Sequence, residues 1–352
     1  MTHPPEPYYS DSQITLYLGD ALDTLRRLPD GSVDCCVTSP PYFGLRDYGV
    51  EGQYGLESSP AEYVETMRAL FAEVRRVLAD DGTLWLNIGD SYYSGRGNPG
   101  PNAADEKQPA RRGWTRVVDK PGQSWAKPKD LLGIPWRVAF ALQDDGWTLR
   151  NDIIWHKANA MPESVSDRLS TRYEHLFMLS KSRSYWFDLD PIREPSVTPE
   201  RYTSALSWNR ATKEADVPGQ SMRQHRTDRA AYQSPGRWAD GSGGRHRDPG
   251  PDGLGLAVGG KNPGDVWSVP TQPFTEAHFA VMPQALAERA IMAGCKPGGT
   301  VLDPFSGSGT TGLAANKHGR KYVGIDLSRD YLDLSLRTRF AQGGFDFGEA
   351  SA

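Results

Sequence analysis

The sequence has few cysteines, no long apolar run and no large excess of charge. Three of its 352 residues are cysteine, and Cys35, Cys36 and Cys295 form no Cys-x-x-Cys pair. This spacing offers neither a zinc quartet nor a disulfide framework, so we expect no metal and interpret these residues as small core residues. No apolar run approaches membrane-spanning length, and residues 1–10 lack a hydrophobic signal core. We therefore expect a cytoplasmic protein without a membrane partner.

The weak net charge argues against binding to nucleic acid through the overall field of the protein. The formal charge is −4, so any DNA contact must come from local basic patches. Two segments, 94–130 and 195–263, carry basic side chains among many glycine and proline residues. Both are long for connections within a compact domain, which is typical either of functional loops or of solvated, disordered ones.

The stretch Thr38-Ser39-Pro40-Pro41-Tyr42 follows an apolar run, residues 33–37. The run predicts a buried strand of a parallel sheet, and the two prolines end it abruptly. Open α/β sheets bind their ligands at this end of their strands. The Ser39 hydroxyl, the Pro40 carbonyl and the Tyr42 ring can hold a flat ring that bears an amine, with two hydrogen-bond acceptors and one stacking face. The alternative is a proline-rich turn without a catalytic role.

A second motif, residues 300–311, predicts a strand, a glycine-rich turn and a helix N-terminus. The next strand, 321–325, ends in Asp326, the position that binds ribose hydroxyls in Rossmann-like folds. The turn reads Asp303-Pro304-Phe305-Ser306-Gly307-Ser308-Gly309. A carboxylate beside the turn would repel a pyrophosphate but suits a cationic amino-acid tail. S-adenosylmethionine (SAM) has such a tail and a ribose, so we predict a SAM site.

The rest of the chain alternates between the apolar patterns that are typical of strands and of helices. Apolar patterns predict strands at 14–18, 83–88, 147–157 and 173–179, and helices at 21–28, 60–78, 134–142 and 283–293. Asp80-Asp81-Gly82 is interpreted as a turn between a helix and a strand. Asp20 stands at a strand end, where it can cap a helix or accept a hydrogen bond from a nucleoside amine. This alternation predicts the α/β class.

These motifs, in this order, resemble the β-class amino-methyltransferases of bacterial and phage restriction–modification systems. In that family a Ser/Asp-Pro-Pro-Tyr motif precedes a target-recognition region and a Phe-x-Gly-x-Gly motif comes last. The resemblance extends to Asp20 and to residues 155–157, 172–175, 181 and 278–283. It implies a Rossmann-like SAM-dependent methyltransferase sheet, circularly permuted. Its catalytic half would be 1–194 with the inserted loop 94–130, its target-recognition region 195–263, and its SAM-binding half 264–352.

The resemblance also implies a function and a set of site residues. The function is the site-specific transfer of a methyl group from SAM to an exocyclic amine of a base flipped out of duplex DNA. The catalytic residues would be Ser39, Pro40, Pro41 and Tyr42. The SAM contacts would be Asp20, Ala21, Thr38, His278, Phe279, Met282, Pro283, Asp303, Pro304, Phe305, Gly307, Ser308, Gly309, Thr310, Thr311, Asp326 and Leu327. The DNA contacts would be Arg46, Arg111, Arg112, Lys157, Arg210, Arg223, Arg226, Arg229 and Arg237.

The first motif residue also bears on the target base. The family more often has serine there in cytosine-N4 enzymes and aspartate in adenine-N6 enzymes, so Ser39 favours cytosine and leaves adenine as the alternative. Cytosine-C5 transfer is disfavoured, because Cys35 and Cys36 lie within the predicted strand. The expected partner is double-stranded DNA, and a cognate restriction endonuclease and a second copy of the chain are further candidates. The rival functions are methylation of protein glutamine or RNA guanine, whose families reverse the motif order, and a catalytically silent SAM- or DNA-binding regulator.

Overall fold

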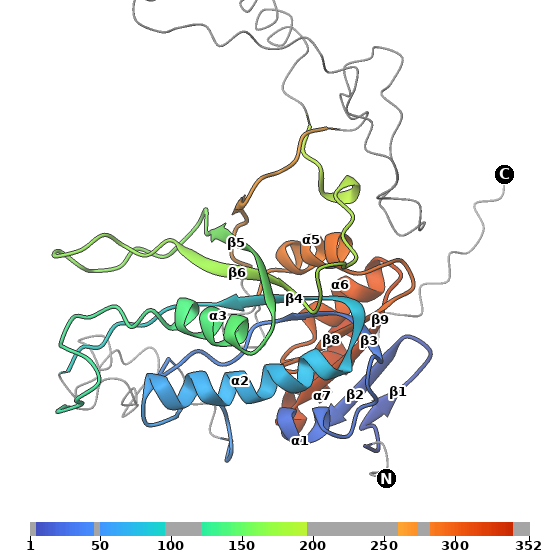
Figure 1. The fold of residues 1–352 in the computed structure, drawn as a ribbon, viewed down its shortest axis with the longest axis horizontal. Helices are drawn as coiled ribbons and strands as arrows, with labels where there is room; N and C mark the ends of the chain where they lie inside the picture. The colour runs from blue at the N-terminus through green and yellow to red at the C-terminus, as the bar shows by residue number, and fades with distance from the viewer. Residues whose placement is uncertain (1–4, 46–49, 96–120, 196–259, 273–281, 341–352) are drawn as a thin grey trace, which may run out of the picture. The chain divides into compact units, whose positions relative to one another are not determined.

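The computed structural model describes residues 5–45, 50–95, 121–195, 260–272 and 282–340 (Figure 1). By its internal contacts the chain divides into two units, residues 1–192 with 263–352, and residues 193–262. In the second unit Glu194 and Lys261 pair through their backbones. The predicted motifs lie in the first unit, which is described below.

The first unit is built on a mixed sheet. Among the described residues the sheet has nine strands in the order β1-β2-β9-β8-β3-β4-β6-β5-β7. Strands β2, β9, β8, β3 and β4 run parallel to one another, whereas β6 is antiparallel to both β4 and β5. The bounds are β1 Tyr9–Ser10, β2 Ile14–Leu18, β3 Val33–Thr38, β4 Leu78–Ile88, β5 Thr148–His156, β6 Tyr173–Ser180, β7 Val266–Ser268, β8 Thr300–Asp303 and β9 Lys321–Asp326.

Helices cover both faces of this sheet. Side chains of α1 (Ala21–Leu25), α2 (Pro60–Val77) and α3 (Ile134–Asp144) belong to one buried cluster. Side chains of α5 (Gln284–Gly294), α6 (Thr310–Lys317) and α7 (Arg329–Ser335) belong to another, together with Phe340 at the end of the π-helical turn Leu336–Phe340. The result is a three-layer α/β/α arrangement, which confirms the predicted fold class.

Adjacent side chains of β3 point to opposite cores. Cys36 belongs to the cluster of α1–α3, and Cys35 and Val37 belong to the cluster of α5–α7. All three are fully buried, which confirms the interpretation of the cysteines of this strand as core residues. Burial raises the pKa of the Cys35 and Cys36 thiols well above the ordinary value, so neither is an activated nucleophile.

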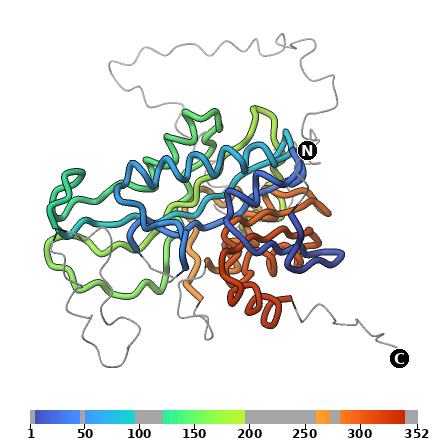
Figure 2. Tube along the Cα trace, turned by 90° about the horizontal axis from the view of Figure 1, so that it is seen from below, coloured from blue at the N-terminus to red at the C-terminus, as the bar shows by residue number. Residues whose placement is uncertain are grey.

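The central strands bring the two ends of the chain together. Strand β2 pairs with β9, and β3 pairs with β8 through Cys35↔Val301 and Cys36↔Leu302. In Figures 1 and 2 the blue N-terminal strands accordingly lie beside the red C-terminal elements. The chain thus forms one Rossmann-like sheet from two distant segments, with the Pro-Pro corner in the first and the glycine-rich turn in the second, as predicted.

The predicted turn at Asp80-Asp81-Gly82 is wrong. Strand β4 begins at Leu78, directly after α2, and Leu78 already pairs with Val33 before a break in register. The backbone of this segment is held from the other side as well, since the Gly82 carbonyl accepts from the Lys181 N–H at 3.3 Å. These long-range hydrogen bonds override the local turn signal.

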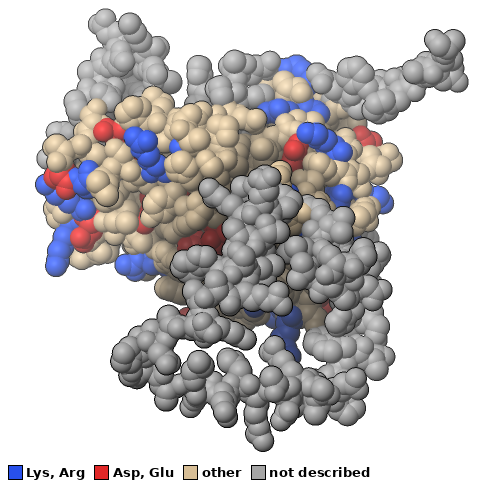
Figure 3. Space-filling model, turned by 90° about the horizontal axis from the view of Figure 1, so that it is seen from above, with Lys and Arg blue, Asp and Glu red and all other residues tan. Residues whose placement is uncertain are grey.

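Two surface properties complete the description. On the face seen in Figure 3, basic and acidic side chains of the described residues are interspersed, and neither sign forms a continuous field. None of the described helices has both the length and the apolar composition needed to cross a membrane.

Gly294, the last residue of α5, lies against β4 with no room for a side chain. An added Cβ would lie 2.1 Å from Trp85 Nε1 and 2.7 Å from Thr83 Oγ1. We expect Gly294→Ala to lower the free energy of unfolding by about 1–3 kcal/mol, although alanine is the better helix former. The measurement is the urea midpoint at an unchanged denaturant slope. A midpoint equal to wild type would contradict the close approach of α5 to β4.

Candidate active site

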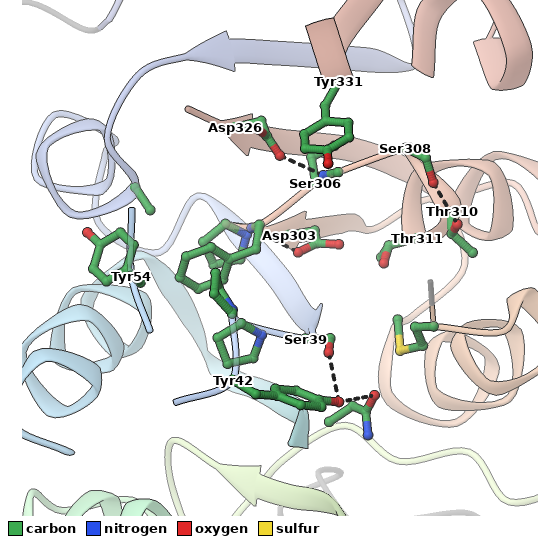
Figure 4. A pocket seen from close by; sticks show the side chains of 18 of the residues that line it. Ser39, Tyr42, Tyr54, Asp303, Ser306, Ser308, Thr310, Thr311, Asp326 and Tyr331 are labelled. Atoms are coloured by element: carbon green, nitrogen blue, oxygen red, sulfur yellow. Dashed lines mark hydrogen bonds between the residues drawn. The ribbon is translucent and has the colours of Figure 1, made fainter. Parts of the chain in front are cut away.

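A cavity of about 400 Å³ opens at the carboxyl ends of the central parallel strands. The Pro-Pro corner after β3 forms one wall, and the glycine-rich turn after β8 forms another (Figure 4). The predicted site residues that line it are Ala21, Ser39, Pro40, Pro41, Tyr42, Lys157, Met282, Asp303, Pro304, Phe305, Gly307, Ser308, Thr310, Thr311, Asp326 and Leu327. The two predicted motifs therefore share one cavity.

The other predicted residues divide into two groups. Four lie in the described structure without lining the cavity, namely Asp20, Thr38, Pro283 and Gly309. The rest lie outside the described residues, namely His278, Phe279, Arg46, Arg111, Arg112, Arg210, Arg223, Arg226, Arg229 and Arg237.

A buried hydrogen bond joins the two motifs. Thr38, at the end of β3, donates from Oγ1 to Asp303 Oδ1 at 2.6 Å, and the Phe305 N–H donates to the same oxygen at 3.0 Å. The contact follows from the pairing of β3 with β8. Asp303 is 3% exposed, and this burial raises the pKa of its carboxyl, an effect that the hydrogen bonds oppose.

Asp326 shapes the glycine-rich turn from the tip of β9. Its Oδ2 accepts from the Gly307 N–H at 2.7 Å and its Oδ1 from the Ser328 N–H at 2.8 Å. Gly307 has φ +51°, in the left-handed region that favours glycine. Burial raises the pKa of Asp326 to about 6, and the negative charge of Asp303 adds to the shift.

Asp20 caps a helix. Its Oδ1 accepts from the Asp23 N–H at 2.9 Å at the start of α1, and its Oδ2 accepts from the Tyr54 hydroxyl at 2.8 Å. The capping interpretation of Asp20 is thereby confirmed. Tyr54 lines the cavity and meets the Phe305 ring edge to face, with the ring centroids 5.4 Å apart. Asp20 does not line the cavity itself, but it holds Tyr54, which forms part of an aromatic wall of the cavity.

The Pro-Pro corner is held from both sides. The Tyr63 hydroxyl donates to the Pro41 carbonyl at 2.9 Å. On the cavity side, the Tyr42 hydroxyl donates to Glu174 Oε2 at 2.6 Å. The Ser39 hydroxyl donates to Tyr42 Oη at 3.3 Å (Figure 4). Burial and the neighbouring Glu174 raise the pKa of Tyr42 well above the ordinary value, so its hydroxyl stays protonated.

Lys157 lies in the wall of the cavity and not on an open surface. Its ammonium group pairs with Glu174 and lies 5.0 Å from the centre of the Trp155 ring. Its predicted role as a DNA contact stays a prediction. The lysine charge is balanced within the wall.

Several lining residues were not predicted as site residues from the sequence. They include Tyr54, Asn87, Glu174, Ser306 and Tyr331. Asn87 lies near the carboxyl end of β4, so the rule that placed Ser39 at a strand end could have found it. Glu174 lies near the start of antiparallel β6, and no local pattern indicates that a residue there reaches this edge. Within the described residues no group of histidine, cysteine or acidic side chains could hold a metal ion.

The fold and the paired motifs define a class, the Rossmann-like methyltransferases with a permuted order of motifs. The model of the DNA methylase family, which spans N6 and N4 enzymes, matches residues 33–337, so the chain belongs to that family. It is a DNA methyltransferase, as the sequence predicted, and the predicted methyl donor, SAM, is confirmed with the family.

Two curated relatives match most of the chain. It is 45% identical over 322 residues to the Type II methyltransferase M.Cfr9I of Citrobacter freundii, with 92% of this chain and 86% of the relative covered. It is 46% identical over 331 residues to the Type II methyltransferase M.XycI of Xanthomonas campestris pv. cyanopsidis, with 94% and 89% covered.

Two solved structures share the fold. PvuII DNA methyltransferase (cytosine-N4-specific) is 18% identical with a TM-score of 0.59, and 98% of this chain and 92% of that one are covered. A chain described as a DNA modification methylase from Thermus thermophilus, in complex with S-adenosyl-L-methionine, is 23% identical with a TM-score of 0.51, and 94% and 95% are covered. At these identities the likeness establishes the fold.

The bond between Thr38 and Asp303 can be tested through its pH dependence. We expect Thr38→Val to lower the free energy of unfolding by about 1–3 kcal/mol near neutral pH, because a buried carboxylate loses a donor. The folded pKa of Asp303 is raised, so stability from this group is present at acid pH and is lost as pH rises through the folded pKa. The substitution raises that pKa further, so the loss should shrink towards pH 4.

Urea denaturation at both pH values measures the effect. Thr66→Val serves as the control, because Thr66 Oγ1 donates to a backbone carbonyl on the exposed side of α2. An equal loss at both pH values would show that the Thr38 hydroxyl does not stabilise an ionised Asp303.

Proposed function

We propose that the protein transfers a methyl group from SAM to the exocyclic N4 amine of cytosine in duplex DNA. The observation that carries the proposal is that Ser39, Pro40 and Tyr42 line the same cavity as Asp303 and the glycine-rich turn. An amine acceptor and a cofactor cradle in one cavity allow direct transfer between two bound molecules.

The cavity has the chemical groups that SAM requires. Its volume of about 400 Å³ is within the range of small-molecule sites. The buried Asp303 carboxylate suits a cationic tail, Asp326 lies at the ribose position of Rossmann-like folds, and the Tyr54 and Phe305 rings offer apolar surface for an adenine. When bound, SAM supplies a methyl group on a positively charged sulfur, which an amine can attack.

Residues of the corner would prepare the target amine. The amine lone pair of cytosine is delocalised into the ring, so the nitrogen is a poor nucleophile. Ser39 Oγ and the Pro40 carbonyl would accept its two N–H bonds, which localises the lone pair on nitrogen and aims it at the cofactor side of the cavity. Tyr42 would contact the face of the flipped base.

The choice of cytosine rests on Ser39. A serine hydroxyl is neutral, and the family resemblance pairs serine at this position with cytosine. Adenine N6 is the second candidate, because its amine has the same two N–H bonds. We propose that residues 195–263 recognise the target sequence. We further propose that the protein acts in the cytoplasm, and that its partners are a cognate restriction endonuclease and a second copy of the chain.

A nucleoside assay tests both the activity and the base. The purified protein is incubated with SAM and mixed-sequence duplex DNA, the DNA is digested, and the nucleosides are identified by mass spectrometry. We expect N4-methylcytosine from wild type. Ser39→Ala should reduce the yield by about a hundredfold or more while SAM binding is retained, because the amine loses an acceptor and the groups proposed to hold SAM are unchanged.

The possible products separate the two proposals. N6-methyladenine would keep the mechanism and reject cytosine as the target base. No methylated nucleoside from any duplex would reject the proposed activity.

The role of Asp326 predicts a pH dependence of SAM binding. The ionised carboxylate accepts hydrogen bonds from ribose hydroxyls, and its pKa is about 6 in the folded protein. The dissociation constant for SAM should therefore rise as pH falls, to about tenfold above its pH 8 value at pH 5. Isothermal titration calorimetry across this range measures it. Asp326→Asn should bind weakly with a flat profile. If Asp326→Asn still loses SAM affinity at acid pH as strongly as wild type does, the titrating group is another one, such as Asp303.

A further inference from the structure

The Ser39 hydroxyl can either donate or accept a hydrogen bond, whereas the proposed reaction needs only an acceptor. An aspartate at this position would accept without help. A serine needs a neighbour that takes its proton and leaves its lone pairs directed to the substrate. The structure contains such a neighbour, Tyr42, and a buried charge behind it.

Tyr42 Oη lies within hydrogen-bond distance of three oxygens. The distances are 2.6 Å to Glu174 Oε2, 3.2 Å to Asn87 Oδ1 and 3.3 Å to Ser39 Oγ. The phenol has one proton, and the short contact with a carboxylate takes it. The amide oxygen has no proton to give, so of these three oxygens only Ser39 Oγ can donate to Tyr42 Oη.

Glu174 is fixed as an acceptor by its own partners. The Lys157 ammonium group pairs with its Oε1, and Asn87 Nδ2 donates to its Oε2 at 3.1 Å. Asn87 Nδ2 also donates to the backbone carbonyl of His175 at 3.1 Å, which sets the orientation of the amide. The side chains of Lys157 and Glu174 are 23% and 14% exposed, so water competes weakly for the pair.

The Tyr42 ring has little freedom to leave this arrangement. A Cβ added at Gly89 would lie 2.7 Å from Tyr42 Cε2, so the ring edge rests directly on the Gly89 backbone. Both the position of the phenol and the direction of its proton are therefore set before any substrate enters.

We propose that Lys157, Glu174 and Tyr42 form a positioning relay that orients the Ser39 hydroxyl. The proton of Ser39 points to Tyr42, and its lone pairs point to the substrate amine. The inference rests on the proposed function and adds two residues to it, Glu174 and Lys157. Glu174 and Lys157 are positioning residues, since they act on the amine only through Tyr42 and Ser39. In this role the charge of Lys157 serves the cavity and not the DNA backbone.

The test is the rate of methyl transfer in a single turnover, in which protein with SAM already bound, in excess over the DNA, is mixed with duplex DNA. Tyr42→Phe keeps the ring and removes the link, and Glu174→Gln keeps the shape and removes the charge. Each should slow transfer by about tenfold or more, with the dissociation constants for SAM and DNA within about twofold of wild type.

A double variant distinguishes a relay from independent structural roles. Because Glu174 acts only through Tyr42, Tyr42→Phe/Glu174→Gln should be no slower than Tyr42→Phe alone. In a Ser39→Ala background, Glu174→Gln should have no further effect on the residual rate. Two independent roles would instead multiply the losses.

Two control variants remove similar contacts elsewhere. Glu288→Gln removes a carboxylate that is 17% exposed and pairs with Lys317 at 2.8 Å, and Tyr9→Phe removes a hydroxyl that donates to Asp11 at 2.9 Å. Neither residue lines the cavity. Both variants should transfer methyl at the wild-type rate, and melting temperatures show whether each variant is folded.

The outcomes separate this inference from the proposed function. Suppose that the wild-type protein methylates DNA. If Glu174→Gln and Tyr42→Phe then react at the wild-type rate, or if their losses multiply in the double variant, the relay is overturned and the proposed function stands. A wild-type protein that methylates no duplex overturns the proposed function, and the relay with it. If Glu174→Gln does not fold, Tyr42→Phe is measured in the wild-type and in the Ser39→Ala background. The relay requires a loss in the first and no further loss in the second, and an equal loss in both overturns it.

Discussion

The parallel pairing of β3 with β8 is the constraint on which the site depends. The two motifs are far apart in the sequence, and Thr38 and Asp303 are separated by 265 positions. The pairing of Cys36 with Leu302 aligns the strands so that both motifs leave the sheet at the same edge. The Thr38–Asp303 hydrogen bond then locks that edge. Neither the Pro-Pro corner nor the glycine-rich turn could form the cavity alone.

The cavity wall contains a buried carboxyl group, that of Asp303, and a half-buried one, that of Asp326, and the ionisation of both is costly. Burial raises the pKa of both Asp303 and Asp326, and the charge of Asp303 adds to the shift at Asp326. Hydroxyl and backbone donors offset part of this cost. A cationic ligand would offset more of it. The desolvation that makes ionisation costly in the absence of a ligand therefore favours a positively charged ligand. This electrostatic preference agrees with the sulfonium and ammonium groups of SAM.

Much of the fold and half of the site could be predicted from the sequence, for a physical reason. Strand ends, proline corners and glycine turns are local signals, and parallel strands carry them to a common edge. For this reason Ser39 and Asp303, both singled out from the sequence, line one cavity. Contacts between strands that are distant in the sequence have no local signal. Glu174 on β6 was therefore missed as a site residue, and the start of β4 at Leu78, which pairs with Val33 of β3, was misjudged. The position of Lys157 in the cavity wall depends on the pairing of β5 with β6, because Lys157 directly follows β5.

A serine at the catalytic corner makes a demand on its surroundings that an acidic residue would not. A carboxylate accepts an N–H bond of an amine without being oriented by a neighbour, but it brings a negative charge that must be desolvated. A hydroxyl avoids that charge and must be oriented from outside. In this protein the charge lies beyond both Ser39 and Tyr42, on Glu174, where Lys157 balances it. The proposed relay thus moves the buried charge from the reacting group to a position where the fold can neutralise it.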